Sequence, residues 1–218
     1  MAPANPSKAR PRSTGPGRPK DLGKRAAILN AARALFFEQG YSGVSMDGIA
    51  ALAGVSKLTV YSHFGDKETL FTEAIRAQCQ QMMPDDLFQH ELRGSLREQL
   101  LDIGTAFFSM IGSEAAIATQ RMMLNPGTGD DHARRMFWEA GPQCSQQAMA
   151  KFLAARVQAG ELEIDNLALA ASQFFHLLKG ELYVRMLCGL HGPPSADEVQ
   201  QHLAASIDFF LRAYVSRS

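Results

Sequence analysis

The chain has little cysteine, and its three residues, Cys79, Cys144 and Cys188, lie far apart. None belongs to a CxxC pair, which excludes a disulfide framework and gives no structural zinc site, so a reducing compartment is favoured. The sequence also lacks a run of alternating apolar and polar residues long enough for a strand, so a sheet fold is not expected. It contains no nucleophile elbow, P-loop, GxGxxG motif after a strand or HExxH motif. No catalytic residue, metal site or cofactor is therefore predicted.

Segments that would target or anchor the chain are missing as well. The N-terminus carries positive charges but no apolar core of a secretory signal. The most apolar stretch, residues 167–190, is interrupted in its middle by Lys179, Glu181 and Arg185, which a membrane-spanning helix would tolerate poorly. It is interpreted as a buried helix. The sequence thus favours a cytoplasmic protein without a membrane partner.

Charge is present in balance but is unevenly distributed. Lys and Arg together number 22, as do Asp and Glu, yet residues 1–25 hold seven basic side chains and one acidic one. Residues 1–20, which consist mainly of Pro, Ser, Gly, Ala and basic residues, are predicted to form a disordered basic arm. Such an arm suits a polyanionic partner, although a simple solvated tail accounts for it equally well.

Helical periodicity dominates from Lys24 onward and predicts an all-α fold of about nine helices. Ser45, Ser56 and Asp66 are the expected N-caps of helices two, three and four. Capping boxes are expected at Ser95 and Ser195, each with Glu three residues later. The pattern over residues 130–157 is expected to break or kink at Gly141-Pro142.

The most informative segment is SMDGIAALAGVSKLTVYSHF, residues 45–64. Two short helices are joined by Ala53-Gly54-Val55-Ser56, where Gly54 can adopt the positive φ of a sharp turn. Ile49, Val55 and Val60 supply the shared core. This is the pattern of a helix-turn-helix unit, although an ordinary helical hairpin has the same turn.

The faces of the second of these helices favour DNA binding. At 100° per residue, Val60 and Phe64 define its buried side, and Leu58, Thr59 and Ser62 lie more than about 100° away from it. A small, mostly polar face of this kind fits a major groove. Leu58 and the Thr59 methyl group are expected to pack on thymine methyl groups, while Ser62 can donate or accept a hydrogen bond.

Together, several motifs resemble the N-terminal domain of TetR-family transcriptional regulators over about residues 17–75. The matching segments are Gly17-Arg18-Pro19, 26–37, Gly40-Tyr41, Ser45-Met46, Ile49-Ala50, 53–57, Thr59-Val60-Tyr61, His63-Phe64 and 67–71. The segment Phe137-Trp138-Glu139-Ala140-Gly141-Pro142 is similar to the AefR-like branch of that family. Leu58, Gly48 and Leu52 depart from the common pattern, and Leu58 makes the operator sequence harder to predict.

The resemblance implies an N-terminal three-helix helix-turn-helix domain and a larger helical ligand-binding and dimerisation domain. Their expected bounds are residues 21–68 and 69–218. It implies a homodimer on a near-palindromic DNA operator, released by a small-molecule effector of unknown identity. The predicted DNA-contacting residues are Arg18, Ser45, Ser56, Lys57, Leu58, Thr59, Tyr61, Ser62, His63 and Lys67.

A ligand pocket is expected among the aromatic and Met residues of the central helices, which suit an apolar or amphipathic molecule. The predicted lining is Phe107, Phe108, Met122, Met123, Phe137, Trp138, Phe174, Phe175 and His176. Gln120, Arg121 and His176 are candidate polar anchors. For each single residue, ordinary core packing is the alternative interpretation.

A dimer interface is expected on the last two long helices, whose apolar surface is larger than packing within the chain requires. The residues predicted there are Leu178, Leu182, Met186, Ile207, Phe210, Leu211 and Tyr214, with Phe209 and Ala213 beside the main stripe.

Two other functions stay open: a nucleoid-organising DNA-binding protein without an effector, and an all-helical enzyme. A metal at Asp130, Asp131 and His132 is rejected because acids are favoured at a helix start anyway.

Overall fold

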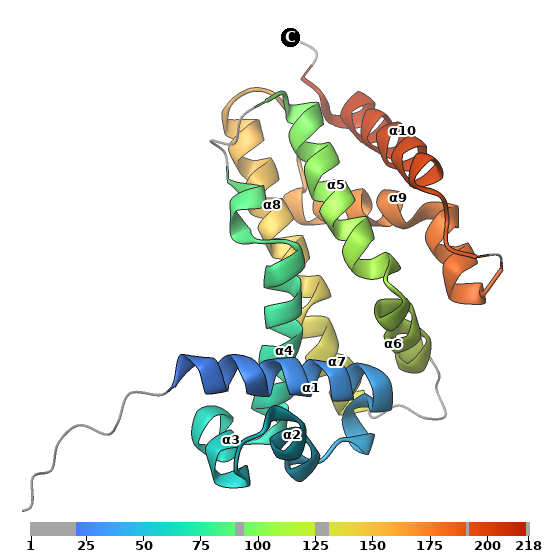
Figure 1. Ribbon diagram of the computed structural model, residues 1–218. Coiled ribbons are helices and arrows are strands. Elements are labelled where there is room, and N and C mark those ends of the chain that lie inside the picture. Colours follow the sequence, from blue (N-terminus) through green and yellow to red (C-terminus); the bar gives the residue numbers. More distant parts are fainter. Residues whose placement is uncertain (1–20, 90–93, 125–130, 191, 217–218) are drawn as a thin grey trace, which may run out of the picture.

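The computed structural model describes residues 21–89, 94–124, 131–190 and 192–216. These ranges are almost entirely helical, and the pairing in them that resembles a strand is one isolated antiparallel bridge between Leu162 and Val215. The helices are α1 Leu22–Gly43, α2 Met46–Ala53, α3 Lys57–Phe64, α4 Lys67–Met82, the 3₁₀ helix η1 Asp85–Phe88, α5 Leu96–Gly112, α6 Glu114–Leu124, α7 Asp131–Ala140, α8 Pro142–Gln158, α9 Leu167–Cys188 and α10 Ala196–Tyr214. The predicted all-α fold is confirmed (Figure 1).

Helices α2, α3, α4, α5 and α10 begin directly after the capping residues that the sequence predicts. The side chains of Ser45, Ser56 and Asp66 accept hydrogen bonds from the backbone N–H groups of Gly48, Thr59 and Thr69. Complete capping boxes open α5 and α10. Each cap satisfies backbone donors that the first turn of a helix leaves without a partner.

The first four helices share one apolar core. Helix α1 lies across α4, with α2 and α3 packed beneath them (Figure 1). Ile28, Ile49, Val60 and Leu70, one from each helix, are fully buried at its centre. Ala140 at the end of α7 joins the same cluster, so this core extends beyond the four N-terminal helices.

The remaining helices enclose a second core. Helix α8 packs on α9, and α5 packs on both α9 and α10. Leu100, Met149, Phe174 and Phe210 are buried at its centre. Helix α4 leaves the first core and leads to η1, which packs on α5 and α8. The two cores are therefore joined through a continuous helix.

Helix α9 differs from the expected uninterrupted helix. Gly180 has φ 47° and ψ −156°, a conformation outside the helical region, and the helix bends there. The imidazole Nε2 of His202 on α10 donates to the Leu178 carbonyl over 2.9 Å, and the Ser206 hydroxyl donates to the Leu177 carbonyl over 3.2 Å. These carbonyls precede the bend, so α10 supplies the donors that the broken helix cannot.

The expected break at Gly141-Pro142 is confirmed, whereas two other expectations stay open. The pattern over residues 130–157 is divided at Gly141-Pro142 into α7 and α8, because Pro142 occupies the first position of a new helix. The predicted arm, residues 1–20, lies outside the described residues, as does Asp130. The domain boundary at residue 68 stays a prediction.

No single helix in the described ranges is long and apolar enough to cross a membrane. Helices α5 and α6 pass a test of length and composition only together, as a pair bent by 67°.

Candidate nucleic-acid interface and ligand cavity

The turn between α2 and α3 has the geometry that its sequence predicts. Gly54 adopts φ 65° and ψ 33°, the left-handed conformation that costs a residue with a Cβ about 1–2 kcal/mol. Its N–H and that of Val55 bond to the last carbonyls of α2. Ile49 and Val60 then bury the inner faces of both helices. The outer face of α3 is left for a partner.

The exposed side of α3 carries the residues that the helical face predicted. Leu58 is 78% exposed, a high value for a large apolar side chain, and Tyr61 is 42% exposed. The Ser62 hydroxyl is exposed and donates to the Thr59 carbonyl over 2.8 Å. Because its hydrogen is engaged within the helix, Ser62 leaves only acceptor lone pairs on the exposed face. Thr59 is half-buried, with its hydroxyl 2.8 Å from that of Ser56.

Lys57 begins α3 and forms an ion pair with the helix before it. Its Nζ donates to a carboxylate oxygen of Asp47 over 2.8 Å. The hydrogen bond to Asp47, and secondly its negative charge, raise the pKa of Lys57, which keeps the ammonium charged. Both side chains are exposed, so a phosphate can reach Lys57 only in competition with Asp47.

Two further predicted contacts lie at the end of the unit. The Lys67 ammonium sits 4.4 Å from the centroid of the Tyr41 ring, a cation–π distance. His63 is half-buried, and its Nδ1 atom is buried without a hydrogen-bond partner in the described part of the chain. Ser45 and Ser56 act as N-caps and are exposed. Arg18 lies outside the described residues.

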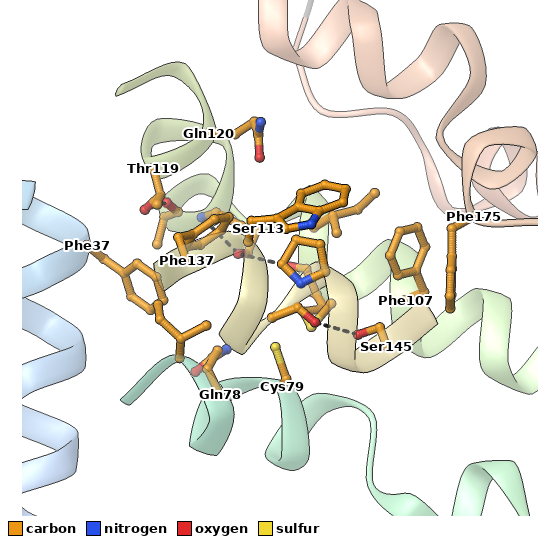
Figure 2. Close-up of a pocket in the computed structure, with 18 of the residues that line it drawn as sticks. Phe37, Gln78, Cys79, Phe107, Ser113, Thr119, Gln120, Phe137, Ser145 and Phe175 are labelled. Atoms are coloured by element: carbon orange, nitrogen blue, oxygen red, sulfur yellow. Dashed lines mark hydrogen bonds between the residues drawn. The ribbon is translucent and has the colours of Figure 1, made fainter. Parts of the chain in front are cut away.

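A cavity of about 380 Å³ lies between the two cores, a size within the usual range for small-molecule sites. Its wall comes from seven helices: α1, α4, α5, α6, α7, α8 and α9. Figure 2 shows the rings of Phe37, Phe107, Phe137 and Phe175 around one space, with Cys79 of α4 below them. The wall is predominantly apolar and aromatic.

The structure brings five of the nine predicted pocket residues to this cavity and places the other four elsewhere. Those that line it are Phe107, Phe137, Trp138, Phe175 and His176. Phe174 is buried in the second core, and Phe108 faces a separate groove on the other side of α5. Met122 lies against Gly40, and Met123 packs on the first core. The helical period identified apolar residues but not which neighbour each one meets.

Polar side chains are interspersed in the wall, among them Gln78, Thr119 and Gln146. Gln120 and His176 reach the cavity, as predicted for polar anchors, whereas Arg121 donates to the carbonyls of Met186 and Leu187 at the end of α9. His176 Nδ1 lies 2.7 Å from the Ser172 carbonyl oxygen, which only accepts. Nδ1 therefore carries the hydrogen, and in the neutral ring Nε2 is left as an acceptor.

Nine lining residues that were not predicted belong to α1, α4 and α9. They are Asn30, Arg33, Ala34 and Phe37 of α1, Ile75, Gln78 and Cys79 of α4, and Lys179 and Tyr183 of α9. The sequence offered one signal: Phe37 lies next to the core residue Phe36 and off the main stripe of its helix. The sequence marks Lys179 only as a charge within an apolar stretch.

The predicted dimer residues divide into two groups. Leu178, Ile207 and Phe210 are fully buried within the chain's own core, which corrects their placement in an interface. Four others, Leu182, Met186, Leu211 and Tyr214, are half-buried and pack on that core. The large apolar side chains that α9 and α10 expose are Leu169, Val184 and Phe209. A strong apolar stripe on a helix therefore indicates burial in the core of its own chain before it indicates a dimer interface.

Other reactive groups give no site in the described residues. They hold no cluster of three or more His, Cys, Asp or Glu side chains arranged for a metal ion. Burial raises the pKa of the Cys79 thiol to about 11, so it stays protonated at neutral pH. Cys144 is half-buried and Cys188 is exposed.

Comparison with known proteins yields matches to both parts of the chain. A family profile described as bacterial regulatory proteins of the tetR family matches residues 28–74. A second profile, described as the C-terminal domain of AefR-like transcriptional repressors, matches residues 98–216, more than half of the chain.

Among curated proteins, the HTH-type transcriptional regulator YdeS of Bacillus subtilis is 37% identical over 68 residues, which are 31% of this chain and 34% of YdeS. The transcriptional repressor AcnR of Corynebacterium glutamicum is 32% identical over 82 residues, 36% of this chain and 44% of AcnR. The chain thus spans less than half the length of these curated relatives.

Two solved structures match over nearly their whole length. The flavonoid-responsive regulator FrrA is 33% identical, with a TM-score of 0.69, and the match covers 91% of this chain and 100% of FrrA. A TetR-family transcriptional regulator from Mesorhizobium loti is 27% identical, with a TM-score of 0.70, covering 89% of this chain and 98% of the other.

Proposed function

The chain belongs to the TetR family of bacterial DNA-binding regulatory proteins, and from this premise we propose that it is a transcriptional repressor controlled by a small molecule. In this proposal it binds a near-palindromic operator as a homodimer. An apolar or amphipathic effector enters the cavity and releases the DNA. A cytoplasmic location follows from that role.

One observation supports the proposed coupling between effector binding and DNA release. The cavity wall includes Phe37 of α1 and Ile75 of α4, and both helices also form the core beneath α2 and α3. An effector would touch the DNA-binding unit directly, and a displacement of α4 would change the distance between the two α3 helices of the dimer, which are proposed to read the DNA. Only an effector that prefers the DNA-incompatible spacing would release the operator.

The exposed side of α3 is proposed to enter the major groove. Leu58 and Ser62 would meet base edges, where sequence is read, while Tyr61 and Lys67 would contact phosphates, which fix position. A single short helix offers few base contacts. Two copies, with half-sites about one helical turn apart, supply a longer operator.

The dimer is proposed to form on the outer faces of α9 and α10. Val184 and Phe209 are 54% and 60% exposed, so they, rather than the buried Leu178 and Phe210, would meet the second copy. A two-fold interface would pair the same patch on both subunits. Sedimentation showing a monomer at micromolar concentration would contradict this part of the proposal.

The decisive experiment is footprinting of the full-length protein on DNA flanking its own gene, repeated with a panel of small molecules. Because the relative FrrA is flavonoid-responsive, the panel should include flavonoids beside other aromatic compounds. A protected near-palindrome that one compound abolishes supports the proposal. Protection without sequence preference or response would favour the nucleoid-organising alternative, and turnover of a compound without DNA would favour an enzyme.

A further inference from the structure

The charged groups on the cavity wall are all cationic. Arg33 of α1 and Lys179 of α9 line the cavity, and none of the described lining residues is an Asp or Glu. Most of the remaining wall is aromatic or aliphatic. A cavity of this kind accepts an anion without meeting a like charge.

The two cationic side chains differ in their hydrogen-bond and charge partners. The Arg33 guanidinium donates to the side-chain oxygens of Gln81 and Asn30. Among the described residues, no carboxylate oxygen lies within 4.0 Å of the Lys179 ammonium. Its Nζ lies over the Tyr183 ring, 5.6 Å from the ring centroid. The side chain is half-buried, and this burial lowers the pKa of Lys179. An ammonium removed from water without an anion is costly, and a bound anion would offset that cost.

Lys179 also lies beside other polar groups of the cavity. His176 and Lys179 lie one turn apart before the bend of α9 at Gly180, and Tyr183 follows the bend. All three line the cavity, with the Lys179 ammonium near the Tyr183 ring, and together they form a polar strip of its wall. The aromatic residues Phe37 and Phe137 belong to α1 and α7, on other sides of the same space (Figure 2). The wall is thus amphipathic, with aromatic rings and a polar strip.

We propose that the effector is an aromatic molecule with an anionic oxygen, and that Lys179 binds this oxygen inside the cavity. This inference rests on the proposed function, in which the cavity holds the effector. The aromatic part packs among the phenylalanine rings. His176 Nε2 accepts a hydrogen bond from a hydroxyl group where the effector has one.

The test compares two molecules of the same shape, biphenyl-4-carboxylate and the uncharged biphenyl-4-carboxamide. Binding to the full-length protein is measured by titration calorimetry at neutral pH. The variants are Lys179→Met, which keeps the length of the side chain, and Lys179→Arg, which keeps the charge. Lys151→Met, an exposed lysine of α8 outside the cavity wall, is the matched control.

The wild-type protein should bind the carboxylate about tenfold to a hundredfold more tightly than the amide, the range expected for a charge-assisted hydrogen bond. Lys179→Met should abolish this preference, whereas Lys179→Arg and Lys151→Met should retain it. The inference is overturned if the amide binds as tightly as the carboxylate, if Lys179→Met keeps the preference, or if neither molecule binds. If a neutral compound nevertheless releases the operator in footprinting, the proposed function stands and this inference alone fails.

Discussion

The ammonium group of Lys57 at the start of α3 lies 2.8 Å from the carboxylate of Asp47 in α2. An exposed pair of this kind contributes little to folding. Its importance lies in binding, because the negative charge of Asp47 stands next to a cation that faces the proposed DNA surface. In the proposed complex, DNA phosphates would compete with Asp47 for Lys57.

Lys57→Met is therefore expected to weaken binding to operator and random DNA alike, and to lower the log–log salt slope by about 0.9, the contribution of one neutralised phosphate. Asp47→Asn should strengthen binding to random DNA a few-fold by removing the competing charge. Fluorescence anisotropy over a range of salt concentrations measures both effects. Asp102→Asn, an exposed acid on α5, serves as the control. Weaker binding by Asp47→Asn would show instead that Asp47 positions Lys57 for DNA.

Leu58 is expected to set sequence preference without supporting the fold. Its side chain is 78% exposed, so Leu58→Ala should change the free energy of unfolding by no more than about 0.5 kcal/mol. The loss of an apolar contact with a thymine methyl group should change the selected operator more than it changes nonspecific affinity. Selection from random DNA with both proteins tests this. Identical motifs would refute base readout by Leu58.

Asp66 is expected to stabilise α4 in a pH-dependent way. Its hydrogen bonds, foremost that from the Thr69 N–H, lower the pKa of this carboxyl group. Asp66→Ala should cost about 1 kcal/mol near neutral pH, whereas Asp66→Asn, which keeps an acceptor, should cost less. Because the folded pKa is the lower one, the stabilisation is present above the unfolded value of about 4 and is lost as the pH falls through the folded value. Urea denaturation at several pH values measures this; a difference that grows on acidification would contradict it.

The bend in α9 is expected to depend on Gly180. Its positive φ, and a Cβ position that would clash with Cε1 of His202, leave no room for a side chain. Gly180→Ala should lower the free energy of unfolding by about 2 kcal/mol or more. His202→Ala alone should cost about 1 kcal/mol, because the Leu178 carbonyl loses its donor. In urea denaturation, the double variant should lose less than the sum of the single losses, since the nearest clash is gone. Strict additivity would show that the close contact is not the cause.

Local features of the fold were predictable from the sequence. The N-caps Ser45, Ser56 and Asp66 and the turn at Gly54 depend on residues within three positions of one another. The exposure of Leu58 follows from a helical wheel fixed by Val60 and Phe64 of the same helix. Features of this kind depend on residues close together in the sequence, so they can be predicted without knowing which distant segments pack against them.

Features that depend on distant neighbours were not predictable in the same way. The apolar pattern continues across Gly180, and the donors that satisfy the broken helix come from α10, 24 and 29 residues later. Likewise, Leu178 and Val184 are both apolar residues of α9, yet the first is buried in the core and the second is 54% exposed. Only the packed helices decide which side of the stripe is covered. The cavity residues of α1 were missed for the same reason.

Ile75 and Phe137 belong both to the cavity wall and to the core that supports the reading helices. A substitution that reshapes the cavity at either position also alters the core on which α2 and α3 pack, and would thereby weaken the proposed operator binding. Gln120 and Gln146 line the cavity without a place in that core. The evolution or engineering of a new effector specificity is therefore expected to proceed through such positions, with Ile75 and Phe137 changing least.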